Sequence, residues 1–147
     1  MFELDSRLQN DTHFVADLPL CKLLLMNDCQ FPWLILVPRV AQARELYRLN
    51  DAQQQQYLHE SSVVCRALEQ LYQPEKLNVA ALGNVVAQLH IHHVARFSTD
   101  CAWPAPVWGK QPAIPYSESE ASKLVNGLRN FLTMQEQSYD LNDYANH

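Results

Sequence analysis

Apolar and polar positions along residues 13–39 follow a pattern that predicts three strands joined by short connections. The stretch HFVADL at 13–18 alternates apolar and polar side chains, as a strand with one buried face does. The runs CKLLLMN at 21–27 and WLILVPR at 33–39 are almost wholly apolar, and the DCQFP between them has the composition of a turn. We therefore expect an antiparallel meander in this part of the chain.

An apolar stripe with helical spacing predicts a helix over residues 51–72, with a cap at Asn50 or Asp51 and a stop at Pro74. The stripe consists of Tyr57, Val64, Leu68 and Leu71. Because these side chains share one face of a helix, we expect that face to be buried. The preceding ARELYRL at 43–49 predicts a short helix of its own.

Two more strands and a final helix complete the predicted order. KLNVAALG at 76–83 and AQLHIHHVAR at 87–96 have strand composition, and the proline-rich stretch 100–116 should form an ordered loop that packs on the sheet. Ser117 and Glu120 fit a capping box at the start of the last helix. Antiparallel strands with a few helices make an α+β fold.

Length and charge narrow the class of protein. The 147 residues suit a single domain, which we place at 1–134, followed by a polar tail at 135–147 where the helical stripe fades. The net charge of −5 and the absence of a basic block disfavour nucleic-acid and acidic-membrane binding. No signal peptide or membrane-spanning run is visible, and none of the four cysteines forms a CxxC pair, so we expect a cytoplasmic protein with reduced thiols.

The chemistry concentrates in the stretch QLHIHHVAR at 88–96. Alternate side chains of a strand point to opposite faces, so Gln88, His90 and His92 should share one face and His93 should point away. Two imidazoles and an amide on one face allow three interpretations. They could hold a metal, act as a nucleophile, or be half-buried and hydrogen-bonded only, which is our interpretation of His93.

The metal interpretation is the weaker one, and we expect no dedicated metal site. His90 and His92 supply two ligands, whereas zinc usually takes three or four, and no spacing singles out the others. A neutral imidazole, by contrast, is a good nucleophile near pH 7. Attack on phosphorus would give a phosphohistidine and divide one difficult displacement into two easier ones.

The stretch resembles the signature of the histidine triad family, in which three histidines alternate with apolar residues on a strand. Here the signature reads Gln88-Leu89-His90-Ile91-His92-His93-Val94, followed by Ala95-Arg96. Upstream, LNVAALGN resembles the family's Asn- and Gly-containing segment, and LLLMNDCQFPWLILVPR resembles its first sheet strands. The similarity extends over about residues 12–109.

The resemblance implies a role for each matching residue. His90 matches the nucleophile that forms a nucleotidyl-histidine intermediate, and His92 matches the histidine that contacts the phosphate. Asn27 matches the asparagine that contacts the ribose, although by chemistry alone it could equally cap a turn. Asn78 and Asn84 are the candidates for phosphate contacts. Arg96 could also neutralise a phosphate, or form a structural salt bridge at the strand end.

The chain departs from the family pattern at three places. Gln88 replaces the first triad histidine; it can donate a hydrogen bond but cannot transfer a proton. General acid–base catalysis typically contributes ~10²–10⁴-fold in rate. Pro32-Trp33 replaces a frequent Gly-His pair, and Val85 replaces a hydroxyl residue. Activity could therefore be reduced, or limited to leaving groups that need no proton.

The favoured hypothesis is a nucleotide hydrolase or nucleotidyl transferase that works without a cofactor. It would act through nucleotidyl-His90 on nucleoside phosphoramidates or dinucleoside polyphosphates, with a purine-type nucleotide as its small-molecule partner. The resemblance also implies a homodimer with a sheet continuous across the interface. Two alternatives stay open: a catalytically weak nucleotide-binding module, and a metal-binding protein built on His90 and His92.

Overall fold

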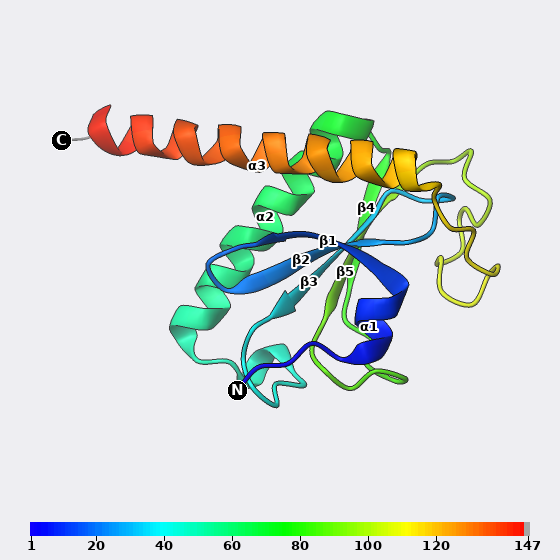
Figure 1. The fold of residues 1–147 in the computed structure, drawn as a ribbon, viewed down its shortest axis with the longest axis horizontal. Coiled ribbons are helices and arrows are strands. Elements are labelled where there is room, and N and C mark those ends of the chain that lie inside the picture. Colours follow the sequence, from blue (N-terminus) through cyan, green and yellow to red (C-terminus); the bar gives the residue numbers. More distant parts are fainter. Residues whose placement is uncertain (146–147) are drawn as a thin grey trace.

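Five antiparallel strands form one sheet in the order β1-β2-β3-β5-β4 in the computed structural model, which describes residues 1–145, with side-chain surroundings up to residue 136 (Figure 1). The strands are β1 (Thr12–Asp17), β2 (Cys21–Met26), β3 (Trp33–Pro38), β4 (Lys76–Ala80) and β5 (Ile91–Arg96). The predicted α+β class and the N-terminal meander are confirmed. The histidine stretch lies on an interior strand of the sheet, because β5 pairs with β3 on one side and with β4 on the other.

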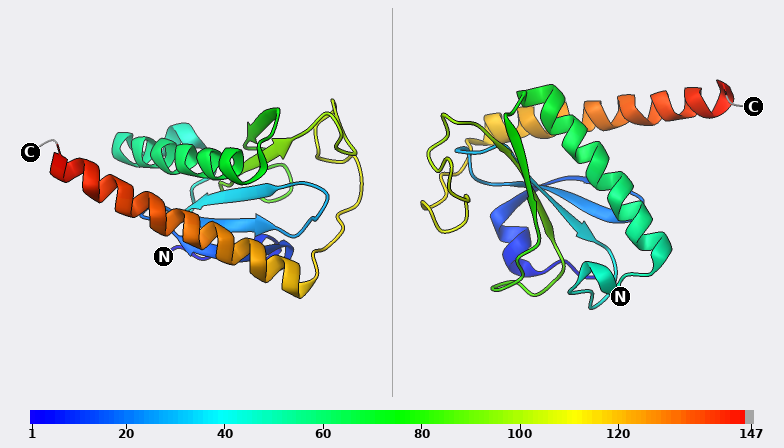
Figure 2. Two further views of the ribbon diagram at one scale, coloured as in Figure 1. Left: turned by 90° about the horizontal axis from the view of Figure 1, so that it is seen from above. Right: turned by 180° about the vertical axis from the view of Figure 1, so that it is seen from behind.

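Helices lie on both sides of this sheet: α1 (Ser6–Asp11), α2 (Asp51–Tyr72) and α3 (Glu118–Ala145), with a 3-10 turn η1 (Leu46–Arg48) before α2. Figure 2 shows α1 and α2 on opposite sides of the sheet. The cap of α2 is as predicted, since Asn50 accepts a hydrogen bond from the Gln53 backbone N–H and the Gln53 side chain accepts one from Asn50 in return. Ser117 likewise accepts from the Glu120 backbone N–H at 3.2 Å.

The two ends of the chain differ from the sequence expectation. The short helix α1 was not predicted, and it begins where Asp5 accepts a hydrogen bond from the Arg7 backbone N–H. The last helix was expected to fade near Met134, but its backbone continues to Ala145 and extends past the sheet (Figure 1). Residues 135–145 are therefore helical, while the domain boundary at 134 stays a prediction.

Each face of the sheet has its own core because neighbouring residues of a strand point in opposite directions. One core joins the sheet to α2 and α3 and contains Leu23, Leu25, Leu34, Leu36, Val64, Leu68, Ala95 and Leu128. The other lies on the α1 side and contains Leu8, Leu24, Phe31, Trp33, Ile35, Val37, Val94 and Val107. Strand β3 is apolar throughout, and β2 is apolar except for Lys22, because both strands are covered on both faces.

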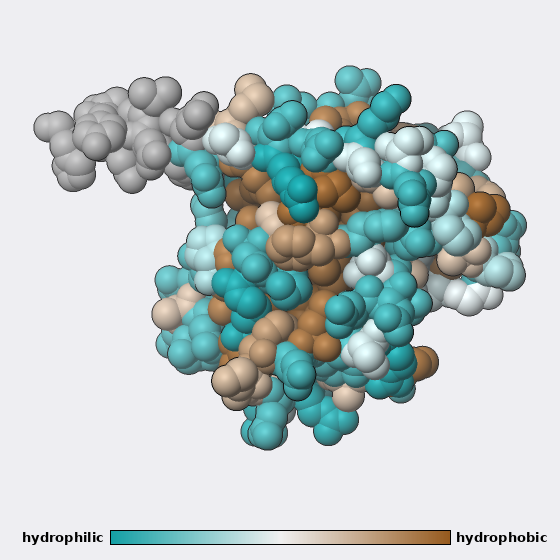
Figure 3. Space-filling model, viewed as in Figure 1, coloured by the Kyte–Doolittle hydropathy of each residue, from teal (hydrophilic) through white to brown (hydrophobic). Residues whose placement is uncertain are grey.

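Polar residues surround this double core at the surface. In the space-filling view, apolar residues are visible in the middle of the face and hydrophilic residues frame them (Figure 3). Among the described residues, no helix has the length and apolar content needed to cross a membrane.

Candidate active site

Strand β5 places His90 and His92 side by side, His90 directly before the strand and His92 inside it. Their rings lie 4.9 Å apart between centroids and meet edge to face at 75°. Both side chains are on the α1 side of the sheet, and each residue is only 7% exposed. The alternation of the strand therefore produces the predicted pair of neighbouring imidazoles.

His93 points to the opposite face, as predicted, and packs under α2. Its Nδ1 donates to the Ile91 carbonyl oxygen at 3.1 Å, and the Ser61 hydroxyl lies 2.8 Å from its Nε2. Burial lowers the pKa of His93 to about 4, so the ring is neutral at pH 7. This histidine is a hydrogen-bonded core residue.

His90 is held in one tautomer by the main chain. Its Nδ1 lies 2.7 Å from the carbonyl oxygen of Gln88. A carbonyl oxygen only accepts hydrogen bonds, so the ring proton is on Nδ1 and donates to it. In the neutral ring, Nε2 then carries a free lone pair, which is the electronic state that a nucleophile needs.

His92 is held in the other tautomer by an indole. The Trp33 Nε1–H donates to His92 Nδ1 at 2.9 Å. Burial lowers the pKa of His92 to about 3, with smaller contributions from the charges of His90 and His93. The ring is therefore neutral at physiological pH and carries its proton on Nε2, so it presents a donor rather than a lone pair.

Aromatic rings enclose His92. Trp33 and Trp108 lie 5.5 Å and 5.2 Å from it between ring centroids, and 6.0 Å from each other. Trp108 comes from the proline-rich loop, which packs on the sheet as expected. Its indole Nε1 is buried and has no hydrogen-bond partner among the described residues.

The Gln88 side chain does not turn toward the two histidines. Its Oε1 accepts from the Asp5 backbone N–H and its Nε2 donates to the Glu3 carbonyl oxygen, both at 2.8 Å. Both polar atoms of the amide are therefore used to attach the N-terminal segment. Gln88 serves His90 through its main-chain carbonyl instead.

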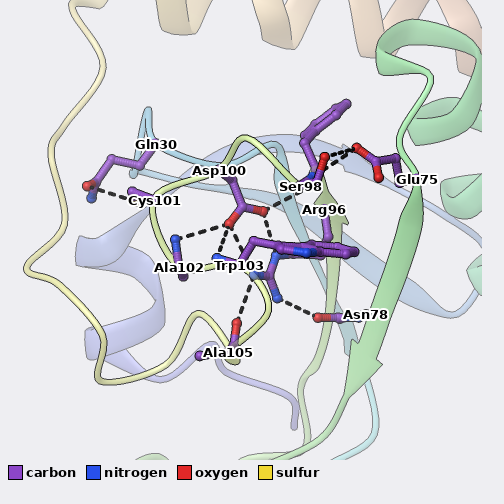
Figure 4. A network of polar contacts seen from close by, with 11 residues as sticks. Gln30, Glu75, Asn78, Arg96, Ser98, Asp100, Cys101, Ala102, Trp103 and Ala105 are labelled. Carbon is purple, nitrogen blue, oxygen red and sulfur yellow. Dashed lines mark hydrogen bonds and ion pairs between the residues drawn. The ribbon is translucent and has the colours of Figure 1, made fainter.

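Arg96 and Asn78 are brought together, but away from the histidines. Arg96 is 2% exposed, forms a two-bond salt bridge with Asp100, and donates to Asn78 Oδ1 at 2.7 Å and to the Ala105 carbonyl oxygen at 2.8 Å (Figure 4). Arg96 lies four positions after His92 along the strand, which is a distance of roughly 13 Å. The structure therefore gives Arg96 the salt bridge that was the alternative to phosphate binding, and we leave Arg96 and Asn78 out of the proposed site.

Asn27 also lies apart from the histidine pair. Strand register places it two strands away from β5, toward the Arg96 end of the sheet. Its side-chain oxygen accepts from the Tyr116 backbone N–H at 3.0 Å, and Cys29 N–H donates to the Ile114 carbonyl oxygen nearby. The asparagine fastens the segment before α3 in this structure.

Open space reaches His90 from the loop between β4 and β5. A hollow of about 30 Å³ lies among Arg44, Glu45, residues 81–83 and residues 88–90. It adjoins a surface groove of about 560 Å³, because Arg44, Glu45, Leu82 and Gly83 line both. Asn84 is exposed in the same loop.

The groove contains two residues that sequence reasoning missed, Arg44 and Arg48. Both are exposed, and Arg48 lies over the Tyr47 ring at 5.2 Å from its centroid. Nothing in the sequence pattern marks them, because the position of their loop beside the His90 segment depends on the Leu89 N–H donating to the Ala43 carbonyl oxygen. Arg44 also lines the hollow at His90, whereas Arg48 lines the groove only. Among residues 1–136, no group of three or more His, Cys, Asp or Glu side chains is arranged to hold a metal ion.

Comparison with known proteins places this arrangement in a family. Residues 7–99 match the HIT domain model. A histidine triad protein from Marinobacter aquaeolei is 49% identical, with a TM-score of 0.88 over 91% of this chain and 98% of that one. One from Bradyrhizobium japonicum is 45% identical, with a TM-score of 0.85 over 88% and 96%.

More distant structures share the fold alone. A hypothetical histidine triad nucleotide-binding protein from Sulfolobus tokodaii is 13% identical, with a TM-score of 0.63 over 83% of this chain and 84% of that one. A search among curated proteins gives no match.

Proposed function

This chain belongs to the histidine triad (HIT) family, whose fold serves nucleotide binding, hydrolysis and transfer, and on that premise we propose that it is a nucleotidyl-transferring hydrolase with His90 as its nucleophile. The observation that carries the proposal is the hydrogen bond from His90 Nδ1 to the Gln88 carbonyl oxygen. It leaves the lone pair of Nε2 free beside a neutral donor, the Nε2–H of His92.

The proposed reaction has two displacements. His90 Nε2 gives its lone pair to the α-phosphorus of a nucleotide, and the bond from phosphorus to the leaving oxygen breaks with its electron pair on that oxygen. The ring, now bonded to phosphorus, is cationic, and its Nδ1–H bond to the Gln88 carbonyl becomes a stronger, charge-assisted one. Water then attacks phosphorus, the N–P bond returns its electrons to Nε2, and the proton of the water passes to solvent.

The leaving group that this site favours is a phosphate chain rather than an amine. An amine must gain a proton as it departs, and Gln88 can neither supply one nor face the substrate while its amide holds residues 3 and 5. A nucleoside polyphosphate leaves as a stable anion. We therefore propose dinucleoside polyphosphates ahead of phosphoramidates, with the departing half in the groove of Arg44 and Arg48.

The proposal is tested by trapping the intermediate. Protein incubated with a diadenosine polyphosphate, and separately with an adenosine phosphoramidate, is quenched in alkali, and its intact mass and free nucleotide are measured. We expect a nucleotidyl adduct on wild type and on His13→Ala, whose histidine lies on β1, and none on His90→Ala. Adduct formation on His90→Ala would remove His90 from the mechanism.

A second candidate is nucleotide binding with little or no turnover. It is favoured by the small exposure of His90 and by a hollow of about 30 Å³, which is the space of one water molecule rather than of a nucleotide. Calorimetry with adenosine nucleotides distinguishes the two. Tight binding without an adduct or released product would favour this candidate over catalysis.

We also propose a homodimer and a cytoplasmic location. The outer edge of β4 has no partner strand in the part of the chain that the structure describes, so a second copy could extend the sheet there. All four cysteines are free thiols, which supports a reducing compartment.

A further inference from the structure

We propose that Trp33 is a positioning residue, whose indole N–H keeps the proton of His92 on Nε2 and so restricts the nucleophilic lone pair to His90. The inference rests on the proposed function for its catalytic meaning. The tautomer of His92, however, follows from the Trp33–His92 hydrogen bond alone, and it can be measured in a protein that has no activity.

The indole of Trp33 limits which nitrogen of His92 can carry the proton. Trp has a single polar atom, an N–H that donates and never accepts. At 2.9 Å from Trp33 Nε1, the Nδ1 of His92 must therefore offer its lone pair. The proton of the neutral ring is then on Nε2, and no lone pair remains on that atom for attack on phosphorus.

Trp33 is fixed well enough to impose this choice. It is the first residue of β3, is 5% exposed, and pairs across the sheet with Val94. The Phe31 ring packs against it edge to face at 6.3 Å, and the carbonyl oxygen of Pro32 accepts from the Ala95 N–H at 2.9 Å. The Phe31 ring and the backbone pairing of β3 with β5 therefore fix the position of the indole.

The charged form of His92 is excluded by the same contact. An imidazolium carries a proton on both nitrogens, so its Nδ1–H would point at the indole N–H and one of two buried donors would lose its partner. Burial and the adjacent His90 and His93 oppose protonation as well. His92 accordingly acts as a neutral hydrogen-bond donor to a phosphoryl oxygen.

This assignment explains how two adjacent histidines take different roles. His90 donates from Nδ1 to a carbonyl and keeps Nε2 free, whereas His92 accepts at Nδ1 and keeps Nε2 protonated. The position that departs from the family pattern, Trp33 in place of histidine, is the one that fixes the second state. Trp33 does not contact the substrate and acts only through His92.

The test compares Trp33→Phe with Trp108→Phe, a matched control. Both remove an indole that contacts His92, but only Trp33 donates a hydrogen bond to it. In histidine ¹⁵N NMR spectra of wild type and of Trp108→Phe, we expect His92 Nδ1 to be unprotonated from pH 5 to 8. In Trp33→Phe, we expect mixed tautomers and a raised His92 pKa.

Turnover gives a second readout. With a dinucleoside polyphosphate, Trp33→Phe should lower kcat by about tenfold, less than the ~10²–10³ lost when a positioned donor is removed outright, while KM changes little. Some adduct should also appear on His92. If Trp33→Phe does not fold, benzothienylalanine at position 33 keeps the bicyclic shape without the N–H.

The outcomes separate the two proposals. An unchanged His92 tautomer in the folded Trp33 variant would overturn the positioning role, whatever the activity. The same tautomer change in Trp108→Phe would also overturn it, because the hydrogen bond would then not be the cause. A changed His92 tautomer in Trp33→Phe, together with a wild-type protein that shows no turnover and no adduct, would uphold the role of Trp33 and count against the proposed function.

Discussion

His90 and His92 are the same residue type two positions apart, yet their ring nitrogens meet opposite partners. His90 Nδ1 faces a carbonyl from two residues earlier, and His92 Nδ1 faces an indole from fifty-nine residues earlier in the chain. The alternation in the sequence predicted that the rings would be adjacent. It could not predict their tautomers, because these depend on atoms that only the folded chain brings into contact.

Because His92 and His93 are buried as neutral rings, the free energy of unfolding should decrease as the pH is lowered. The pKa values of His92 and His93 are lowered from 6.5 to about 3 and about 4. Below pH 6.5 the unfolded chain binds protons that the folded protein does not, so stability is complete above pH 6.5 and is lost progressively as pH falls toward 4. Each histidine contributes up to about 1.4 kcal/mol per pH unit in that range.

Urea unfolding between pH 7.5 and pH 4.5 measures this slope. His93→Phe removes one of the two groups, and its slope should be about half that of wild type across the same range. A variant slope equal to that of wild type would show that His93 is not a source of the pH dependence.

At the scale of elements, the proline-rich loop that carries Trp108 is attached to β5 by a buried ion pair. Burial raises the pKa of the Asp100 carboxyl group. Hydrogen bonds from Arg96 and from the backbone N–H groups of Phe97, Ala102 and Trp103 outweigh this effect and hold the pKa at about 2. The Arg96 and Asp100 side chains are 2% and 5% exposed. The pair therefore stays charged at neutral pH.

Replacing Arg96 should consequently destabilise the fold strongly. Arg96→Met leaves the Asp100 charge buried without its partner, and we expect a loss of about 3–5 kcal/mol in the free energy of unfolding. Lys22→Met removes the ion pair between Lys22 and Asp17, whose side chains are 22% and 52% exposed respectively. This change should lower the free energy of unfolding by less than about 1 kcal/mol. Denaturant unfolding at pH 7 measures both, and equal losses would contradict the structural role of Arg96.

The elements that the sequence predicted well are those with strong internal patterns. The apolar runs of β2 and β3, the buried Val64 and Leu68 of the α2 stripe, and the capping residues Asn50 and Ser117 each reflect local chemistry. Leu71, which was expected on the buried face of α2, is 45% exposed instead, in the last turn of the helix. The short helix α1 escaped notice because six residues carry too little periodicity, and its attachment depends on the distant Gln88 amide. For the same reason, the sequence could not show that this amide is turned away from the histidines.

At the scale of the whole molecule, the two edges of the sheet differ in whether another part of the chain covers them. On β1, the Arg129 guanidinium of α3 donates to the Val15 carbonyl oxygen at 2.7 Å and to that of Phe14 at 3.5 Å, which occupies acceptors that another strand would need. Strand β4 forms the opposite edge of the sheet, with Val79 47% exposed. An uncovered edge pairs readily with another strand, so β4 is the edge through which we expect two copies to join.

A charge on β4 should therefore separate the proposed dimer. Val79→Glu places a carboxylate at the edge strand, where pairing would desolvate it, and light scattering should report the mass of one chain instead of two. Phe14→Glu is the matched control, since Phe14 is also 47% exposed but lies on the blocked edge of β1. It should keep the dimer mass. Dissociation by Phe14→Glu but not by Val79→Glu would place the interface on β1, and a wild-type protein with the mass of one chain would contradict the dimer itself.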